Sequence, residues 1–138
     1  MYLIDTNVVS EARKRPKPNR GVIAFFETVA ASSEPLFLSA ISVGELRRGV
    51  ELIRRCGDAD QAQRLEAWLA IVVESFGERI LAFDAQAAQV WGHLRVPDPS
   101  HALDKQIAAI ALVNNLTLVT RNVTDFEGSG VKLVNPFP

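Results

Sequence analysis

Short apolar runs alternate with longer amphipathic stretches along this chain. Five apolar runs are typical of buried strands, and they cover residues 2–4, 36–38, 79–83, 116–119 and 131–134. Apolar residues between them recur at helical spacing, which predicts helices near 8–12, 20–31, 43–53, 85–91 and 103–112, and one from Asp58 or Asp60 to Gly77. Strands that alternate with helices favour a parallel sheet. The pattern therefore predicts an α/β fold, with about five parallel strands and helices on both faces of the sheet.

Composition narrows the class of protein without identifying it. The 138 residues fit a single domain, 1–138, and 48% apolar with 22% charged residues is ordinary for a globular protein. A lone cysteine, Cys56, excludes an internal disulfide and a thiolate metal cage, and it suits a cytoplasmic location. No secretory signal is evident, and no apolar run reaches the roughly 20 residues that cross a bilayer. The net charge of −1 means that any affinity for nucleic acid must come from local basic patches.

The first strand stops at a cluster of polar residues, Asp5-Thr6-Asn7. In an open parallel sheet, ligands bind outside the carboxyl ends of the strands, which is where Asp5 falls. Aspartate is also a good helix N-cap, so Asp5 alone fits a purely structural role equally well. Whether other carboxylates reach the same edge of the sheet decides between the two interpretations.

Two further acidic residues lie early in predicted helices. Glu45 follows the second strand, although Ser42 and Glu45 also fit a capping box, in which the glutamate bonds back to the cap. Asp104 shares a helix face with Ile107 and Ala108, so it points inward or toward a cleft. Its alternative role is favourable interaction with the helix dipole.

The fourth strand ends near Asn122 and Asp125, which again places polar groups after a strand. Asp84 also follows a strand, but we interpret it as the N-cap of the next helix. The two histidines, His93 and His101, lack the spacing of a zinc pair and are expected on the surface.

Asp5, Glu45, Asp104 and Asp125 could therefore converge on one edge of the sheet. Carboxylates held this close repel one another unless a cation neutralises them. A hard divalent ion such as Mg²⁺ or Mn²⁺ suits such oxygen ligands. An ion held in this way can activate water and stabilise the charge that develops on a phosphate during in-line displacement. Attack by water predicts a 5′-phosphate and a 3′-hydroxyl as products.

Four motifs, taken in order, resemble a known family across essentially the whole chain. They are Leu3-Ile4-Asp5-Thr6-Asn7, Ser42 to Glu45, Leu103-Asp104 with Ile107-Ala108-Ala109, and Thr120-Arg121-Asn122 with Asp125-Phe126. Each motif alone is weak, but their order and spacing resemble PIN-domain ribonucleases, most of all the VapC-type toxins of bacterial toxin–antitoxin pairs.

The resemblance implies a Rossmann-like sheet, RNA cleavage that depends on Mg²⁺ or Mn²⁺, and a homodimer. It also implies a VapB-type antitoxin that inhibits the toxin and binds operator DNA. By position, Asp5, Glu45 and Asp104 would be metal ligands, with Asp125 as the fourth acid. Some members carry the fourth acid at the position of Asn122. The supporting residues would be Thr6, Asn7, Thr120 and Asn122. The segment Ser100-His101-Ala102 departs from the expected pattern.

Basic residues at Arg13, Lys14 and Arg121 are candidates for contacts with RNA phosphates, and Arg15, Lys17, Arg47 and Arg48 extend this set. The basic stretch of residues 13–20 also fits a simple solvated loop. Two other functions compete with the nuclease. An aspartyl phosphatase would need a second aspartate where Asn7 stands. A catalytically silent PIN-like module would act only through its antitoxin or DNA partner.

Overall fold

A computed structural model describes residues 1–14 and 17–138, so the predicted phosphate contact at Arg15 lies outside the described residues. The strands are β1 (Tyr2–Ile4), β2 (Leu36–Ser39), β3 (Ile80–Leu81), β4 (Thr117–Val119) and β5 (Leu133–Val134). They form one sheet in the order β3-β2-β1-β4-β5, and every neighbouring pair is parallel. The α/β fold predicted from the sequence pattern is thus confirmed.

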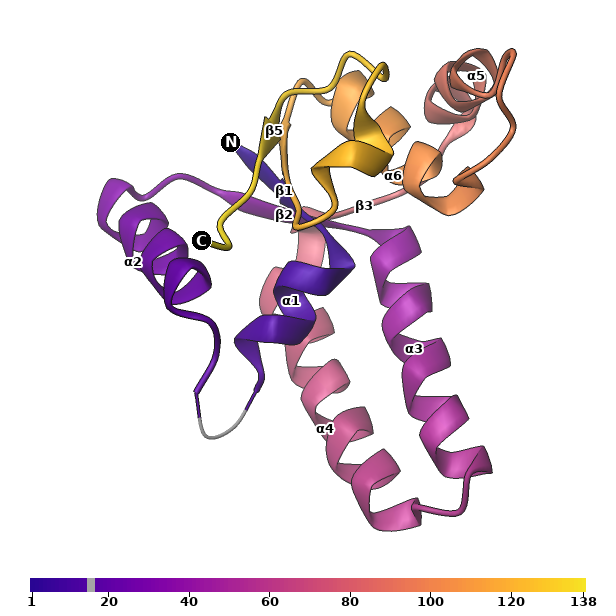
Figure 1. The fold of residues 1–138 in the computed structure, drawn as a ribbon. Coiled ribbons are helices and arrows are strands. Elements are labelled where there is room, and N and C mark those ends of the chain that lie inside the picture. Colours follow the sequence, from indigo (N-terminus) through magenta and orange to yellow (C-terminus); the bar gives the residue numbers. More distant parts are fainter. Residues whose placement is uncertain (15–16) are drawn as a thin grey trace.

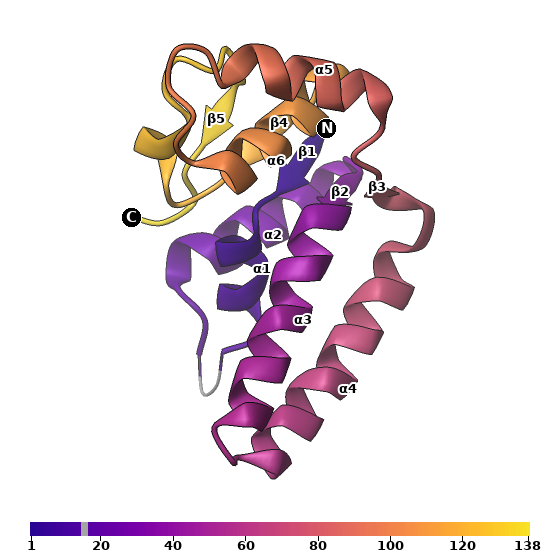
Figure 2. The same cartoon turned by 90° about the vertical axis from the view of Figure 1, so that its right-hand side faces the viewer.

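Two helices lie between each pair of consecutive strands from β1 to β4 (Figure 1). They are α1 (Thr6–Ala12), α2 (Arg20–Ser32), α3 (Ala40–Arg55), α4 (Ala59–Phe76), α5 (Ala85–Leu94) and α6 (Ala102–Val113), with 3-10 turns η1 (Gly77–Arg79) and η2 (Val123–Phe126). Figures 1 and 2 show α3 and α4 as a long pair of helices that extends away from the sheet. Asn19, Asp58 and Asp84 accept backbone hydrogen bonds at helix starts, which confirms the predicted cap at Asp84.

Alternate residues of the central strands face two separate apolar layers. Leu3 and Leu118 pack with α5 and α6 on one face. Ile4, Leu38 and Val119 pack with α1 to α4 on the other. Helices therefore cover both faces, and this double burial explains why the strands read as continuous apolar runs rather than as alternating patterns.

The two central strands bring distant polar residues together. Ile4 of β1 lies in register with Val119 of β4, and the Asp5 amide donates to the Val119 carbonyl at 2.9 Å. The residues that follow each strand, Asp5 and Thr120, are therefore neighbours at the carboxyl edge of the sheet. This pairing of chain segments 115 residues apart builds the centre of the site.

Small residues allow α6 to lie close to the sheet. Ala108, Ala109 and Ala111 are completely buried, as is Ile107. This confirms the inward face predicted for the helix that carries Asp104. Among the described residues, no helix is both long and apolar enough to span a membrane.

Candidate functional site

Asp5 is a buried carboxylate surrounded by hydrogen-bond donors. It is only 4% exposed and lies at the N-cap of α1, where Oδ1 accepts from the Thr6 amide at 2.8 Å. Its second oxygen, Oδ2, accepts from Thr120 Oγ1 at 2.7 Å and from Asn7 Nδ2 at 3.3 Å. The capping role is therefore real, but it occupies only one oxygen. The other oxygen is held by side chains of residues that cap nothing.

Thr120 and Asn7 link the two strand ends. The Thr120 hydroxyl is buried and also accepts from the Asn122 amide at 3.1 Å. Asn7 contacts this hydroxyl at 3.4 Å through Nδ2 and accepts from the Arg121 amide at 3.2 Å. This small network orients the Asp5 carboxylate and shapes the turn after β4.

Glu45 is held by the segment that carries Asp5. Thr6 Oγ1 lies 2.8 Å from Glu45 Oε1 and 2.8 Å from Ser42 Oγ. The capping-box alternative is wrong, because α3 begins earlier and its cap is Ser39, which accepts from the Ser42 amide. Glu45 is thus in the second turn of α3 and is free to face Asp5.

Asp104 and Asp125 meet on the other side of the same edge. Asp104 lies in the first turn of α6, as the helix-dipole interpretation requires, while Asp125 comes from η2. Ligand atoms of Asp104, Asp125 and His101 all lie within 4.8 Å of one another. Both histidines are exposed, as predicted, but the prediction missed that His101 faces the acidic residues.

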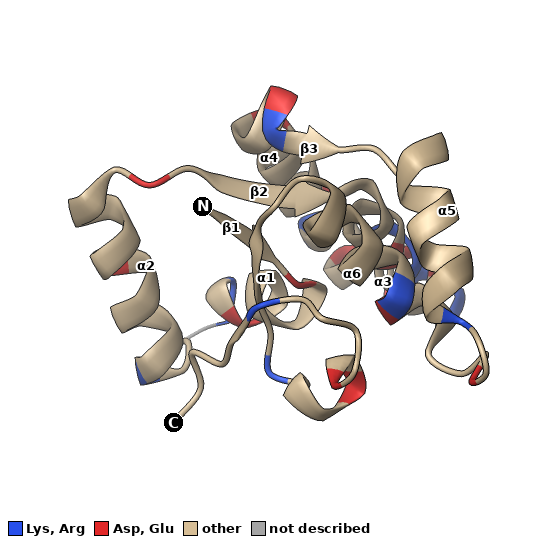
Figure 3. Ribbon diagram, turned by 90° about the horizontal axis from the view of Figure 1, so that it is seen from above, with Lys and Arg blue, Asp and Glu red and all other residues tan. Residues whose placement is uncertain are grey.

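The charges of neighbouring carboxylates act on Asp104 and Asp5. Burial and the charges of Asp5, Asp125 and Glu45 together raise the pKa of Asp104 to about 6. Burial also raises the pKa of Asp5, although the Thr120 hydrogen bond opposes this rise. Glu45 and Asp125 act on both Asp5 and Asp104, so the four acids predicted from separate segments share one region, although of the four only Asp104 and Asp125 belong to the group within 4.8 Å. Figure 3 shows acidic positions near the ends of α1 and α6.

The other predicted residues are more dispersed. Lys14 pairs with Glu11 at 2.8 Å, so part of its charge is already matched. The Arg13 guanidinium lies over the Trp68 ring and that of Arg121 over the Phe137 ring. Arg47 is bound to Glu51 and Glu66 rather than free for phosphate.

Comparison with known protein families assigns nearly the full chain to one family. Residues 2–127 match the PIN domain. The chain belongs to the PIN domain family. It is 36% identical to toxin FitB of Neisseria gonorrhoeae, with 99% of each chain covered. It is 33% identical to VapC ribonuclease Y4jK of Sinorhizobium fredii, covering 99% of this chain and 98% of that protein.

Solved structures agree with this assignment. FitAcB from Neisseria gonorrhoeae superposes on this PIN domain with a TM-score of 0.85, at 35% identity and with 99% and 98% of the two chains covered. VapBC2 from Rickettsia felis, bound to a DNA fragment from its promoter, superposes with a TM-score of 0.69, at 26% identity and with 97% of each chain covered.

The donor set of this PIN domain suits a hard cation. Four carboxylates supply oxygen ligands of the kind that a hard divalent ion prefers, and burial together with the neighbouring charges raises the pKa of Asp104. Among the salt bridges of the described residues, none joins a lysine or arginine to these four carboxylates. The residues present therefore fit a divalent ion at this edge of the sheet.

Proposed function

We propose that this protein is a metal-dependent endoribonuclease that acts as the toxin of a toxin–antitoxin pair. The observation that carries the proposal is the convergence of Asp5, Glu45, Asp104 and Asp125 at the carboxyl edge of the sheet, where burial and the charges of the other three acids raise the pKa of Asp104. The name of a relative, VapC ribonuclease Y4jK, supports RNA as the substrate.

In this proposal the four carboxylates hold Mg²⁺ or Mn²⁺. Asp125 is preferred to Asn122 as the fourth ligand because its carboxylate joins the close group with Asp104. Asn122 instead contributes its backbone amide to Thr120. A bound ion would supply Lewis-acid stabilisation of the phosphate and a lowered pKa for the attacking water.

The chain's own side chains prepare the site. Thr120 and Asn7 fix one oxygen of Asp5, and Thr6 fixes one oxygen of Glu45, so both carboxylates keep a defined orientation. Such outer hydrogen bonds commonly contribute 10–100-fold to metal affinity, roughly 1.4–2.8 kcal/mol. Arg13 and Arg121 are proposed to contact RNA phosphates, which positions the chain without reading its sequence.

Water attack on the phosphodiester breaks the bond between phosphorus and the 3′ oxygen. The phosphoryl group stays on the 5′ side as a 5′-phosphate, and the leaving 3′ oxygen takes up a proton. No 2′,3′-cyclic product forms, because the 2′-hydroxyl is not the nucleophile. The end groups of the RNA products therefore report on the mechanism.

The partners are also proposed from the relatives. The solved VapBC2 complex is bound to promoter DNA, and FitAB is likewise bound to a DNA fragment. We infer a cognate VapB-type antitoxin that neutralises this protein and carries the operator-binding surface. The toxin itself is inferred to form a homodimer.

The test is RNA cleavage by the purified protein, freed of any partner, in Mg²⁺, Mn²⁺ or excess EDTA. Asp5→Asn is compared with Asp84→Asn, a matched control, because Asp84 also follows a strand and caps a helix but lies outside the acidic group. Asparagine caps a helix about as well as aspartate, so both variants are expected to fold.

We expect cleavage in either metal by the parent chain and by Asp84→Asn, and none by Asp5→Asn or in EDTA. Equal cleavage by a folded Asp5→Asn variant would refute the proposed chemistry. Absence of both cleavage and metal binding in the parent chain would instead favour the catalytically silent module.

A further inference from the structure

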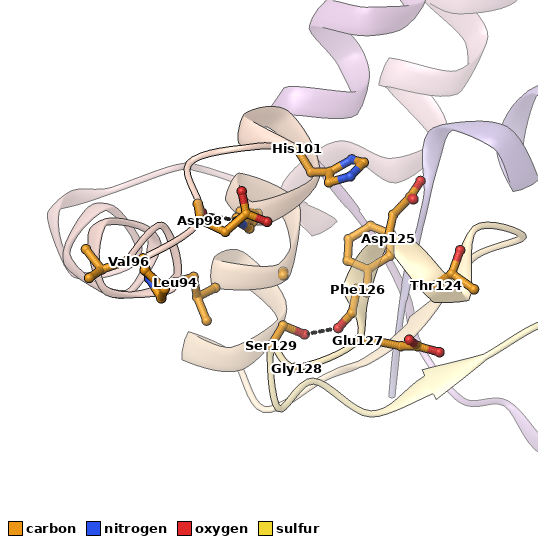
Figure 4. A pocket seen from close by; sticks show the side chains of 13 residues that line it. Leu94, Val96, Asp98, His101, Thr124, Asp125, Phe126, Glu127, Gly128 and Ser129 are labelled. Atoms are coloured by element: carbon orange, nitrogen blue, oxygen red, sulfur yellow. Dashed lines mark hydrogen bonds between the residues drawn. The ribbon is translucent and has the colours of Figure 1, made fainter.

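His101 lies beside the acidic group although no part of the proposed function requires it. Its Nδ1 atom is 3.9 Å from Asp104 Oδ2, and its ligand atom lies within 4.8 Å of those of Asp104 and Asp125. Figure 4 shows His101 and Asp125 directed toward the same space, one from the segment before α6 and the other from η2. They border a cleft of about 310 Å³ that Asp98, Lys105 and Phe126 also line.

The backbone at His101 is unusual. It occupies the N-cap position of α6 with φ 56° and ψ 45°, which is the left-handed region, yet its side chain makes no capping hydrogen bond. Residues other than glycine adopt this conformation infrequently, because their Cβ then approaches the following carbonyl oxygen. The imidazole therefore does not cap α6. It lies instead beside the carboxylates of Asp104 and Asp125.

The spacing of the three groups suits a single ion. Ligands that share one ion at about 2.2 Å lie roughly 3–4.4 Å from one another, depending on their angle at the ion. The His101–Asp104 distance of 3.9 Å falls in this range. All three ligand atoms lie within 4.8 Å of one another, close to this range.

We propose that His101 supplies a nitrogen ligand to the divalent ion, next to Asp104 and Asp125, and that this ligand makes the site prefer Mn²⁺ to Mg²⁺. Imidazole suits transition-metal ions, whereas Mg²⁺ strongly favours oxygen ligands and retains its water. The inference rests on the proposed function, because it requires an ion at the acidic site.

The chain contains only two histidines, so the nitrogen ligand can be identified by spectroscopy. The experiment is pulsed electron paramagnetic resonance of the untagged protein loaded with Mn²⁺, which detects ¹⁴N of a coordinated imidazole. His101→Asn is compared with His93→Asn, a control in the exposed part of α5. Asparagine is chosen because it tolerates the left-handed conformation.

We expect the Mn²⁺ signal to show imidazole modulation, that is, modulation by ¹⁴N of a coordinated imidazole, in the parent chain and in His93→Asn. This modulation should be lost in His101→Asn. Calorimetry should show that His101→Asn weakens Mn²⁺ binding by at least about tenfold, the loss common even for outer hydrogen-bond partners, while Mg²⁺ binding changes little. Bound Mn²⁺ without imidazole modulation would overturn this inference and leave the nuclease proposal intact. Absence of bound Mn²⁺ in the parent chain would overturn both.

Discussion

Removing the charge of Asp104 should make the metal-free protein more stable. In the folded chain, burial and the charges of Asp5, Asp125 and Glu45 raise its pKa from the ordinary 3.8 to about 6. The folded state therefore binds a proton more tightly than the unfolded state does. Above pH 6 the carboxyl is ionised in both states, and folding must bring the charge close to its neighbours. Asp104→Asn removes that penalty without changing the size of the side chain.

The size of the gain follows from the pKa. One pKa unit corresponds to about 1.4 kcal/mol, so a rise from 3.8 to about 6 corresponds to about 3 kcal/mol without screening. The Asp104 side chain is 28% exposed, so water screens part of this interaction. We therefore expect Asp104→Asn to raise the free energy of unfolding at pH 8 by about 1–2 kcal/mol.

The sign of the pH dependence is specific. Between pH 3.8 and about 6 the folded state binds more protons than the unfolded state, so this group's contribution to stability falls as pH rises through that window. The advantage of Asp104→Asn at pH 5 should be roughly half of its value at pH 8. Urea unfolding in EDTA, followed by circular dichroism at both pH values, measures this difference.

Asp98 provides a matched control, because its pKa is shifted in the opposite direction from that of Asp104. Hydrogen bonds from the Ser100 amide and hydroxyl lower the pKa of Asp98, so its charge helps the folded state above the ordinary pKa. Asp98→Asn should therefore bring no gain at pH 8. An Asp104→Asn variant that is no more stable than the parent, or whose gain is the same at both pH values, would show that the Asp104 charge does not destabilise the folded chain. With Mn²⁺ present, the parent chain should be more stable than Asp104→Asn, because the bound ion stabilises the parent chain more than the variant.

Other predictions concern packing and the hydrogen bonds around the acids. Gly21→Ala should lower the free energy of unfolding by about 1–3 kcal/mol, because the new Cβ would clash with the Pro136 carbonyl oxygen. Gly92→Ala, in open space within α5, should raise it by about 0.5–1 kcal/mol, and urea unfolding distinguishes the two. Thr120→Val, which removes the donor to Asp5, should cost about 1.5–3 kcal/mol and weaken Mn²⁺ binding measured by calorimetry. Thr6→Val should weaken Mn²⁺ binding without altering Asp5's bond to Thr120, and unchanged affinity would contradict its role toward Glu45.

The order of strands and helices was predictable because burial on both faces leaves long apolar runs between polar turns. The position of Asp5 was likewise predictable, since the carboxyl ends of parallel strands share one edge. The predicted ends of the strands were less accurate. The expected strand at 79–83 is only Ile80–Leu81, because Gly77–Arg79 forms a 3-10 turn before it.

The contacts between side chains could not be predicted from local sequence patterns. Ser42 and Glu45 fit a capping box by spacing, and only the early start of α3 at Ala40, with Ser39 as its cap, excludes it. The approach of His101 to Asp104 depends on a left-handed residue before α6, which no periodicity signals. The unusual Ser100-His101-Ala102 segment was the one available hint.

The position of a bound ion is the most direct test of the proposed metal site. Crystals of the protein grown with Mn²⁺ can be measured at an X-ray wavelength where manganese scatters anomalously. We expect an anomalous peak at the carboxyl edge of the sheet, bonded to Asp104 and Asp125 and facing Asp5. Saturated Mn²⁺ binding in solution, with a peak elsewhere on the molecule or none at this edge, would contradict it.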